Sequence, residues 1–178
     1  MPFQKFDVKM PSLDVSRNKG DYVEQYGDTF TSYFVKDVDY VLSEFSKILD
    51  FTILPDFYFY VEVTKEGAGP HIDESKTSLN YYFEGCEAET LFWTTKNDDS
   101  GFLCQNQINK QSQVKTYFEH ELISIGSFCA EANSLYLLDI SKIHSVKKRS
   151  VHNVRRILRF LWDKNHFDEI SSSIKIKK

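Results

Sequence analysis

The spacing of hydrophobic and polar residues divides the chain into one helical stretch and many short strands. Hydrophobic residues recur at every third or fourth position between 38 and 49, which predicts an amphipathic helix there. Asp37 precedes this stretch, where an N-cap carboxylate binds the free N–H groups of the first turn. Elsewhere, runs rich in β-branched and aromatic residues predict strands at 29–35, 57–64, 78–83, 90–95, 115–119, 122–125, 134–138, 144–146 and 154–162.

Many short strands at fairly regular intervals, after a single helix, favour a mainly β fold with one or more flanking helices. An antiparallel sandwich or a jelly roll (double-stranded β-helix, cupin-like) fits this pattern. The 178 residues fit a single domain, which we expect over 1–178 with a barrel core at 57–162. Residues 1–26 have no sustained period and predict an irregular arm with room for one short edge strand.

Composition and charge narrow the class of protein. The formal net charge is −4, which does not favour a phosphate backbone, so we expect no nucleic-acid partner. No run approaches the roughly 20 apolar residues of a membrane-spanning helix, and the N-terminus lacks the pattern of a secretory signal. The three cysteines are far apart and form no paired motif. We therefore expect a cytoplasmic protein with reduced thiols at Cys86, Cys104 and Cys129.

A histidine and a carboxylate two residues apart, His71 and Asp73, follow a Gly-Pro turn. Residues i and i+2 of a strand project to the same face, so both side chains can converge on one point. A distant histidine, His144, stands at the start of another predicted strand. Two histidines and one carboxylate form the facial triad that leaves coordination positions open on ferrous iron. The sequence therefore predicts a metal site.

The order His-x-Asp, distal His and then Arg on the last strand resembles the superfamily of Fe(II)- and 2-oxoglutarate-dependent oxygenases over 57–162. The resemblance implies that His71, Asp73 and His144 bind iron, and that Fe(II), 2-oxoglutarate and O2 are used to hydroxylate a substrate. Asp73 implies hydroxylation rather than halogenation, because halogenating relatives carry a small residue there. The chain is loosely similar to the prolyl and aspartyl/asparaginyl hydroxylase branches, which leaves a small molecule or a peptide as the substrate.

Three arginines on the last predicted strand compete to bind the C5-carboxylate of 2-oxoglutarate. Arg156 shares a face with apolar residues suited to a barrel interior, namely Leu158, Phe160 and Trp162. Arg155 shares the opposite face with Arg159. Alternation therefore favours Arg156, with Arg155 second and Arg159 third. The spacing from His144 to Arg156 is about two residues longer than the commonest family pattern, and a bulge would absorb the difference.

Some relatives place a serine or threonine two residues after this arginine, where Leu158 stands here. We expect another polar side chain on a neighbouring strand to supply that contact, the candidates being Asn80, Tyr82, Tyr60 and Tyr58. Substrate specificity is expected to reside in the loop 97–113 and the N-terminal arm.

Two other classes of protein remain open at this point. One is a cupin-like metal protein without 2-oxoglutarate chemistry, although such sites usually carry an additional histidine close to the first, which this sequence lacks. The other is a metal-free jelly roll with a binding or structural role, which would give the three proposed ligands no reason to converge.

Overall fold

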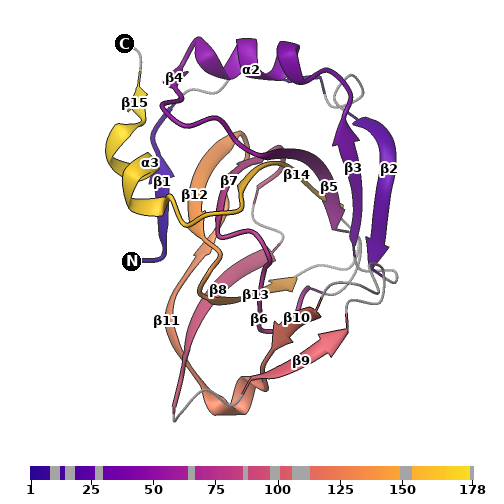
Figure 1. The fold of residues 1–178 in the computed structure, drawn as a ribbon, viewed down its shortest axis with the longest axis vertical. Coiled ribbons are helices and arrows are strands. Elements are labelled where there is room, and N and C mark those ends of the chain that lie inside the picture. Colours follow the sequence, from indigo (N-terminus) through magenta and orange to yellow (C-terminus); the bar gives the residue numbers. More distant parts are fainter. Residues whose placement is uncertain are drawn as a thin grey trace.

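Two antiparallel β-sheets face each other, and a helix covers the outer face of the larger one (Figure 1). The computed structural model describes residues 1–8, 13–14, 19–26, 30–63, 67–85, 88–96, 101–105, 113–148 and 154–176. The helices are α2 (Val38–Ser46), the 3₁₀ turn η1 (Glu119–Glu121) and α3 (Phe167–Ser173).

The strands follow the chain in two groups. The first group is β1 (Phe3–Phe6), β2 (Lys19–Tyr26), β3 (Phe30–Val35), β4 (Leu49–Asp50), β5 (Phe57–Val63), β6 (His71–Ile72), β7 (Thr77–Tyr82) and β8 (Ala88–Thr95). The second group is β9 (Phe102–Gln105), β10 (Gln113–Thr116), β11 (Leu122–Cys129), β12 (Ser134–Asp139), β13 (Ile143–Lys148), β14 (Arg155–Trp162) and β15 (Lys175–Ile176).

The larger sheet has the strand order β1-β12-β7-β14-β5-β3-β2, and the smaller sheet has the order β11-β8-β13-β6-β10-β9. Eight of these strands, from β5 to β14 without the β9–β10 hairpin, form the centre of both sheets. Numbered in chain order, they read 6-3-8-1 in one sheet and 5-4-7-2 in the other. This is the interleaved order of two Greek keys. The expected mainly β fold with flanking helices is confirmed.

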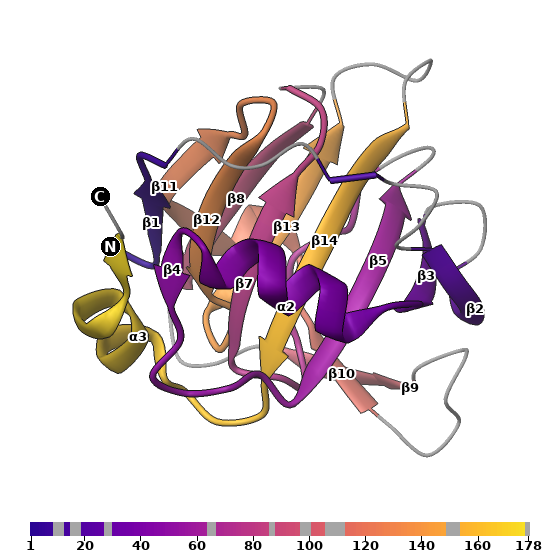
Figure 2. The same cartoon turned by 90° about the horizontal axis from the view of Figure 1, so that it is seen from above.

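Helix α2 lies across the outer face of the larger sheet (Figure 2). Val41 and Phe45 are fully buried against that face, in a cluster that includes Leu79 of β7 and Leu158 of β14. The Phe45 ring meets Phe160 edge-on, with the ring centroids 4.8 Å apart. The outer face of this sheet is therefore a hydrophobic core of its own.

A second cluster fills the space between the two sheets. It includes Val61 of β5, Phe92 of β8, Tyr136 of β12 and Ile157 of β14. Because the larger sheet is covered on both sides, every residue of β7 and β12 is buried.

Asp37 caps α2 as its position predicts, since its carboxylate accepts a hydrogen bond of 2.9 Å from the Tyr40 N–H. Replacing Asp37 with alanine should lower the free energy of unfolding by about 1 kcal/mol, measured by urea denaturation. The control is Ser43→Ala, which removes an exposed hydroxyl bonded within the helix and should change stability by less than about 0.5 kcal/mol. Equal losses in the two variants would contradict the capping role.

The sequence expectation for the N-terminal arm needs correction, and the C-terminal end contains an element that was not predicted. The arm over 1–26 contributes β1, paired with β12, and β2, paired with β3, so it forms both edges of the larger sheet. Near the other end, Phe167–Ser173 form α3, which the hydrophobic pattern did not predict. In both places the secondary structure is formed by packing and strand pairing with distant parts of the chain.

Cys129 is disulfide-bonded, whereas Cys104 is free. The expectation of a reduced thiol at Cys129 is therefore wrong. Disulfides are typical of oxidising compartments, and a cytoplasmic location stays a prediction. Among the described residues, no helix has the length and apolar character needed to cross a membrane.

Candidate metal centre

Two neighbouring strands of the smaller sheet carry the two histidines. His71 in β6 and His144 in β13 are directly opposite in the antiparallel register, with ring centroids 4.5 Å apart. Asp73 follows β6 and turns its carboxylate toward both rings. The candidate ligand atoms of the three residues lie within 4.8 Å of one another. The structure thus brings His71, Asp73 and His144, called the triad below, to one point.

The separations within the triad suit a shared metal ion. His71 Nε2 lies 3.2 Å from Asp73 Oδ1, and His144 Nε2 lies 3.6 Å from Asp73 Oδ2. Two donors bound at right angles, each about 2.1 Å from a metal, are about 3 Å apart. Two imidazole nitrogens and one carboxylate oxygen also leave further coordination positions for other ligands.

The second nitrogen of each ring fixes how the histidines point. His71 Nδ1 lies 2.7 Å from the Gly69 carbonyl oxygen, and His144 Nδ1 lies 3.0 Å from the Lys142 carbonyl oxygen. Carbonyls only accept, so each Nδ1 carries the hydrogen. In the neutral ring, both Nε2 lone pairs then face the Asp73 carboxylate, which also only accepts. A positive ion between them, either a proton or a metal, satisfies this arrangement.

The charges in the triad shift the pKa values of His71 and Asp73. Burial lowers the pKa of His71, but the hydrogen bond to Asp73 and its negative charge more than offset this, and the pKa is raised. Burial raises the pKa of Asp73, but hydrogen bonds from His144 and His71 hold it well below its usual value. In the metal-free protein, the triad is therefore a stabilising cluster of opposite charges.

These shifts predict the pH dependence of stability without metal. The raised pKa of His71 gives stability that is present below about pH 6.5 and is lost as the pH rises through the folded-state value. The lowered pKa of Asp73 gives stability that is present above about pH 4 and is lost on acidification. Thermal unfolding in chelator should show this loss above about pH 6.5. The loss should be smaller in Asp73→Asn, and identical pH profiles for the two proteins would contradict the charge pairing.

The three arginines of β14 face two different sides of the sheet. Arg156 lies on the outer side, where it forms an ion pair with Glu84 and its side chain is 40% exposed. Arg155 and Arg159 point between the two sheets, toward the triad side. The expectation that Arg156 points into the same pocket as the triad is therefore wrong. Its apolar neighbours on the strand belong to the core beneath α2 rather than to the barrel interior.

Arg155 is a buried cation, with only 3% of its surface exposed. Its Nη2 donates a 3.2 Å hydrogen bond to Thr90 Oγ1 across the barrel, and its guanidinium carbon lies 4.7 Å from the centre of the Tyr82 ring. Its Nη1 has no hydrogen-bond partner among the described residues. Burial lowers the pKa of Arg155. Such a guanidinium is suited to an anion that enters the barrel.

Arg159 lies next to the triad itself. Its Nη2 donates a 3.1 Å hydrogen bond to Asp73 Oδ2, and its side chain is 24% exposed. Alternation along β14 already placed it on one face with Arg155, but its contact with Asp73 could not be read from the sequence.

Comparison with solved structures bears on the fold. The epimerase SnoN, whose structure was solved in complex with Fe3+, alpha-ketoglutarate and nogalamycin RO, aligns with a TM-score of 0.51 and 7% identity over 79% of this chain and 67% of that chain. Together with the strand order, this decides the architecture. The chain has a cupin-type jelly-roll fold.

Weaker matches include vicilin from Corylus avellana, with a TM-score of 0.44 and 14% identity over 80% of this chain, and Bacillus subtilis oxalate decarboxylase, with a TM-score of 0.41 and 12% identity over 81% of this chain. The chain spans 31% and 28% of those two proteins, respectively. No protein-family model and no curated protein matches the sequence.

Two of the four proposed polar contacts lie inside the jelly roll. Ser78 donates to Asn80 Oδ1 over 2.5 Å, and Asn80 Nδ2 donates to Tyr82 Oη over 3.2 Å, in a buried row along β7. Tyr82 ends this row beneath Arg155. Asn80 and Tyr82 therefore face the barrel interior, and their contact with the cosubstrate stays a prediction.

The other two proposed contacts, Tyr60 and Tyr58, face away from the barrel interior, because β5 turns Val61 and Val63 inward instead. Tyr60 is buried on the outer side, where burial strongly raises its pKa. Tyr58 packs edge-on against Phe160, in the core beneath α2. The expectation that Tyr60 contacts the cosubstrate is therefore also wrong, because Tyr60, like Arg156, lies on the outer face of the sheet.

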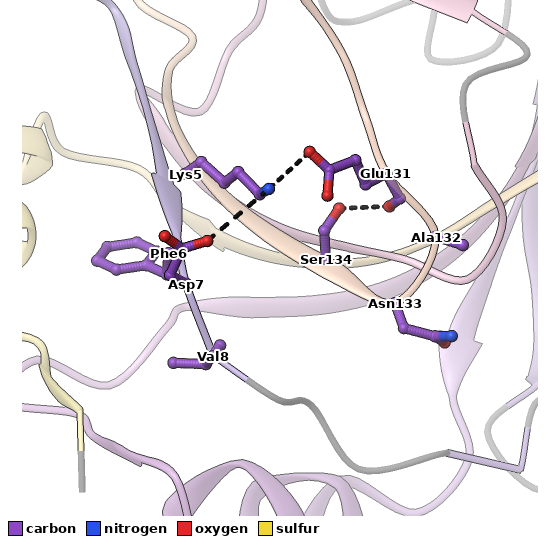
Figure 3. A pocket seen from close by; sticks show the side chains of 8 residues that line it. All are labelled: Lys5, Phe6, Asp7, Val8, Glu131, Ala132, Asn133 and Ser134. Atoms are coloured by element: carbon purple, nitrogen blue, oxygen red, sulfur yellow. Dashed lines mark hydrogen bonds and ion pairs between the residues drawn. The ribbon is translucent and has the colours of Figure 1, made fainter. Parts of the chain in front are cut away.

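Most of the loop 97–113, where we expected substrate specificity, lies outside the described residues. A polar hollow lies at the edge of the jelly roll between β1 and the turn before β12 (Figure 3). Lys5 spans it with a 2.6 Å bond to Glu131. Its lining includes neither a triad residue nor an arginine of β14, so it is separate from the candidate metal centre.

Proposed function

We propose that this protein is an Fe(II)- and 2-oxoglutarate-dependent dioxygenase that hydroxylates an organic substrate. One observation carries the proposal. A two-histidine, one-carboxylate triad and a buried arginine with an unpaired N–H face the same interior of a jelly roll. Because the described residues give Arg155 no carboxylate partner, its guanidinium can bind the carboxylate of a ligand such as 2-oxoglutarate.

In the proposed site, His71, Asp73 and His144 hold the iron through two Nε2 atoms and one carboxylate. Iron(II) bound there would supply O2 activation, in a reaction that converts 2-oxoglutarate, O2 and a substrate C–H group into succinate, CO2 and a C–OH group. The backbone carbonyls of Gly69 and Lys142 keep both imidazoles in the tautomer that presents Nε2. They hold the ligands ready before the metal arrives.

Arg155 is proposed to bind the C5-carboxylate of 2-oxoglutarate. A guanidinium offers two parallel N–H groups to a carboxylate and stays charged when buried. Thr90 Oγ1 fixes one side of the guanidinium, and the Tyr82 ring lies against its face, which leaves Nη1 for the ligand. The Tyr82 O–H, itself accepting from Asn80, can donate to the same carboxylate.

Burial divides the site into an inner and an outer part. His144 and Arg155 are nearly inaccessible, with 5% and 3% of their surfaces exposed. The side chains of His71 and Asp73 are 19% and 26% exposed. The cosubstrate therefore occupies the inner part, where water is excluded, and the substrate approaches from the side of His71 and Asp73.

Anaerobic titration with Fe(II) and then 2-oxoglutarate tests the proposal. The expected result is a weak visible metal-to-ligand charge-transfer band that requires both additions. Metal binding without this band would support a cupin-type metal protein of another kind. Absence of metal binding would support a metal-free jelly roll. Either of these two results overturns the dioxygenase.

A further inference from the structure

Arg159 leaves an unbalanced positive charge in the outer part of the site. Among the described residues of the barrel interior, Arg155 and Arg159 carry two positive charges, and Asp73 carries the one carboxylate beside them. A divalent metal and doubly charged 2-oxoglutarate cancel each other. One positive charge then remains uncompensated, which is costly in a partly buried site.

The metal would also compete with Arg159 for its present partner. Arg159 Nη2 bonds to the same Asp73 oxygen, Oδ2, that faces His144 Nε2. Its Nε is buried and has no hydrogen-bond partner among the described residues. An anionic group on the exposed side of the triad would satisfy both nitrogen atoms.

A row of phenylalanines adjoins Arg159 on the same face of the sheet. Phe59 is directly opposite Arg159 in the register of β5 and β14, and Phe34 is opposite Phe59 in the register of β3 and β5. The rings of Phe34 and Phe57 each stack with Phe59, with centroids 5.8 Å and 6.2 Å away. Phe34 is 53% exposed and Phe57 is 42% exposed. Contiguous exposed aromatic rings mark a binding surface.

We propose that Arg159 and the phenylalanine row Phe34, Phe59 and Phe57 bind the substrate, and that this substrate is an organic acid with an apolar, ring-bearing body. The acid group pairs with Arg159 beside the triad, and the body lies on the exposed rings. The assignment deepens the proposed dioxygenase function and rests on it. It divides the inward-facing arginines between two anions, Arg155 for the cosubstrate and Arg159 for the substrate.

The test compares an acid probe with its uncharged analogue. Protein loaded with Mn(II) and 2-oxoglutarate is titrated calorimetrically with 3-phenylpropionate and with 3-phenylpropionamide. The acid should bind at least about tenfold more tightly, as for a charge-assisted hydrogen bond. Arg159→Met should reduce this preference to less than about twofold, and Arg159→Lys should retain part of it. Phe34→Ala should weaken both probes by a similar factor, about threefold or more.

Arg156→Met is the matched control, because Arg156 is on the same strand but faces outward, and it should keep the full acid preference. Equal affinities for acid and amide in the wild type would overturn the inference. So would a loss of 2-oxoglutarate binding in Arg159→Met as large as that in Arg155→Met, because Arg159 would then serve the cosubstrate. The charge-transfer band reports the dioxygenase separately. An Arg159-dependent acid preference without that band would sustain the acid site and remove the dioxygenase.

Discussion

Replacing Asp73 with alanine is expected to abolish succinate formation from 2-oxoglutarate and to weaken Fe(II) binding by more than about 100-fold. Loss of residues that only support metal ligands costs about 10- to 100-fold in affinity or activity, and Asp73 supplies a ligand atom itself. Its carboxylate is also the shared partner of His71, His144 and Arg159. Without this carboxylate, the two imidazole rings and the Arg159 guanidinium lie close together with no anion between them.

Metal affinity from competition with a chromogenic chelator, together with succinate quantified by mass spectrometry, measures this effect. His120→Ala is the control, since His120 is exposed and distant from the triad in the chain, and it should leave both quantities unchanged. Full succinate production by Asp73→Ala would remove the iron assignment.

The second large effect is expected for Arg155→Met, which should weaken 2-oxoglutarate binding by roughly 100-fold, as when one partner of a buried ion pair is lost. The same change should raise the thermal unfolding temperature of the protein without ligands, because it removes a buried charge with no acidic partner among the described residues. A residue retained for binding at a cost in stability is typical of functional sites.

Fluorescence or calorimetric titration of 2-oxoglutarate and a thermal melt measure both effects. Arg156→Met removes a half-exposed ion pair with Glu84 and should change neither quantity appreciably. If Arg156→Met lost 2-oxoglutarate and Arg155→Met did not, the assignment of the cosubstrate arginine would be reversed.

The sequence was informative where local geometry decides. The i, i+2 alternation of a strand placed His71 and Asp73 on one side, and the structure brings His144 to the same point through the β6–β13 register. Asp37 at the start of a 3.6-residue period located α2. The strand runs and their order gave the architecture, because a jelly roll alternates short apolar strands with turns.

The wrong choice of Arg156 has a physical cause. Alternation shows which residues of β14 share a face, but it does not show which face is the interior of the barrel. Leu158, Phe160 and Trp162 form a more apolar face than the barrel side, because α2 covers them. The barrel side must instead accommodate Arg155 and Arg159. The more apolar face of β14 is therefore the one that α2 covers, and the face that carries Arg155 and Arg159 is the one that lines the site.

The contact between Arg159 and Asp73 could not be predicted, since it depends on how far β6 and β14 approach each other from opposite sheets. The prediction for Tyr60 was wrong for the same reason as that for Arg156, because both residues lie on the outer side of the larger sheet. The phenylalanine row could not be predicted from the sequence either. Phe34 comes from β3, which the sequence could not place beside β5.

The decisive measurement is a crystal structure of the protein grown anaerobically with Fe(II) and 2-oxoglutarate. We expect an anomalous iron peak bound by His71 Nε2, the Asp73 carboxylate and His144 Nε2, with the C5-carboxylate of 2-oxoglutarate on Arg155. An iron peak elsewhere, or 2-oxoglutarate bound away from Arg155, would contradict it.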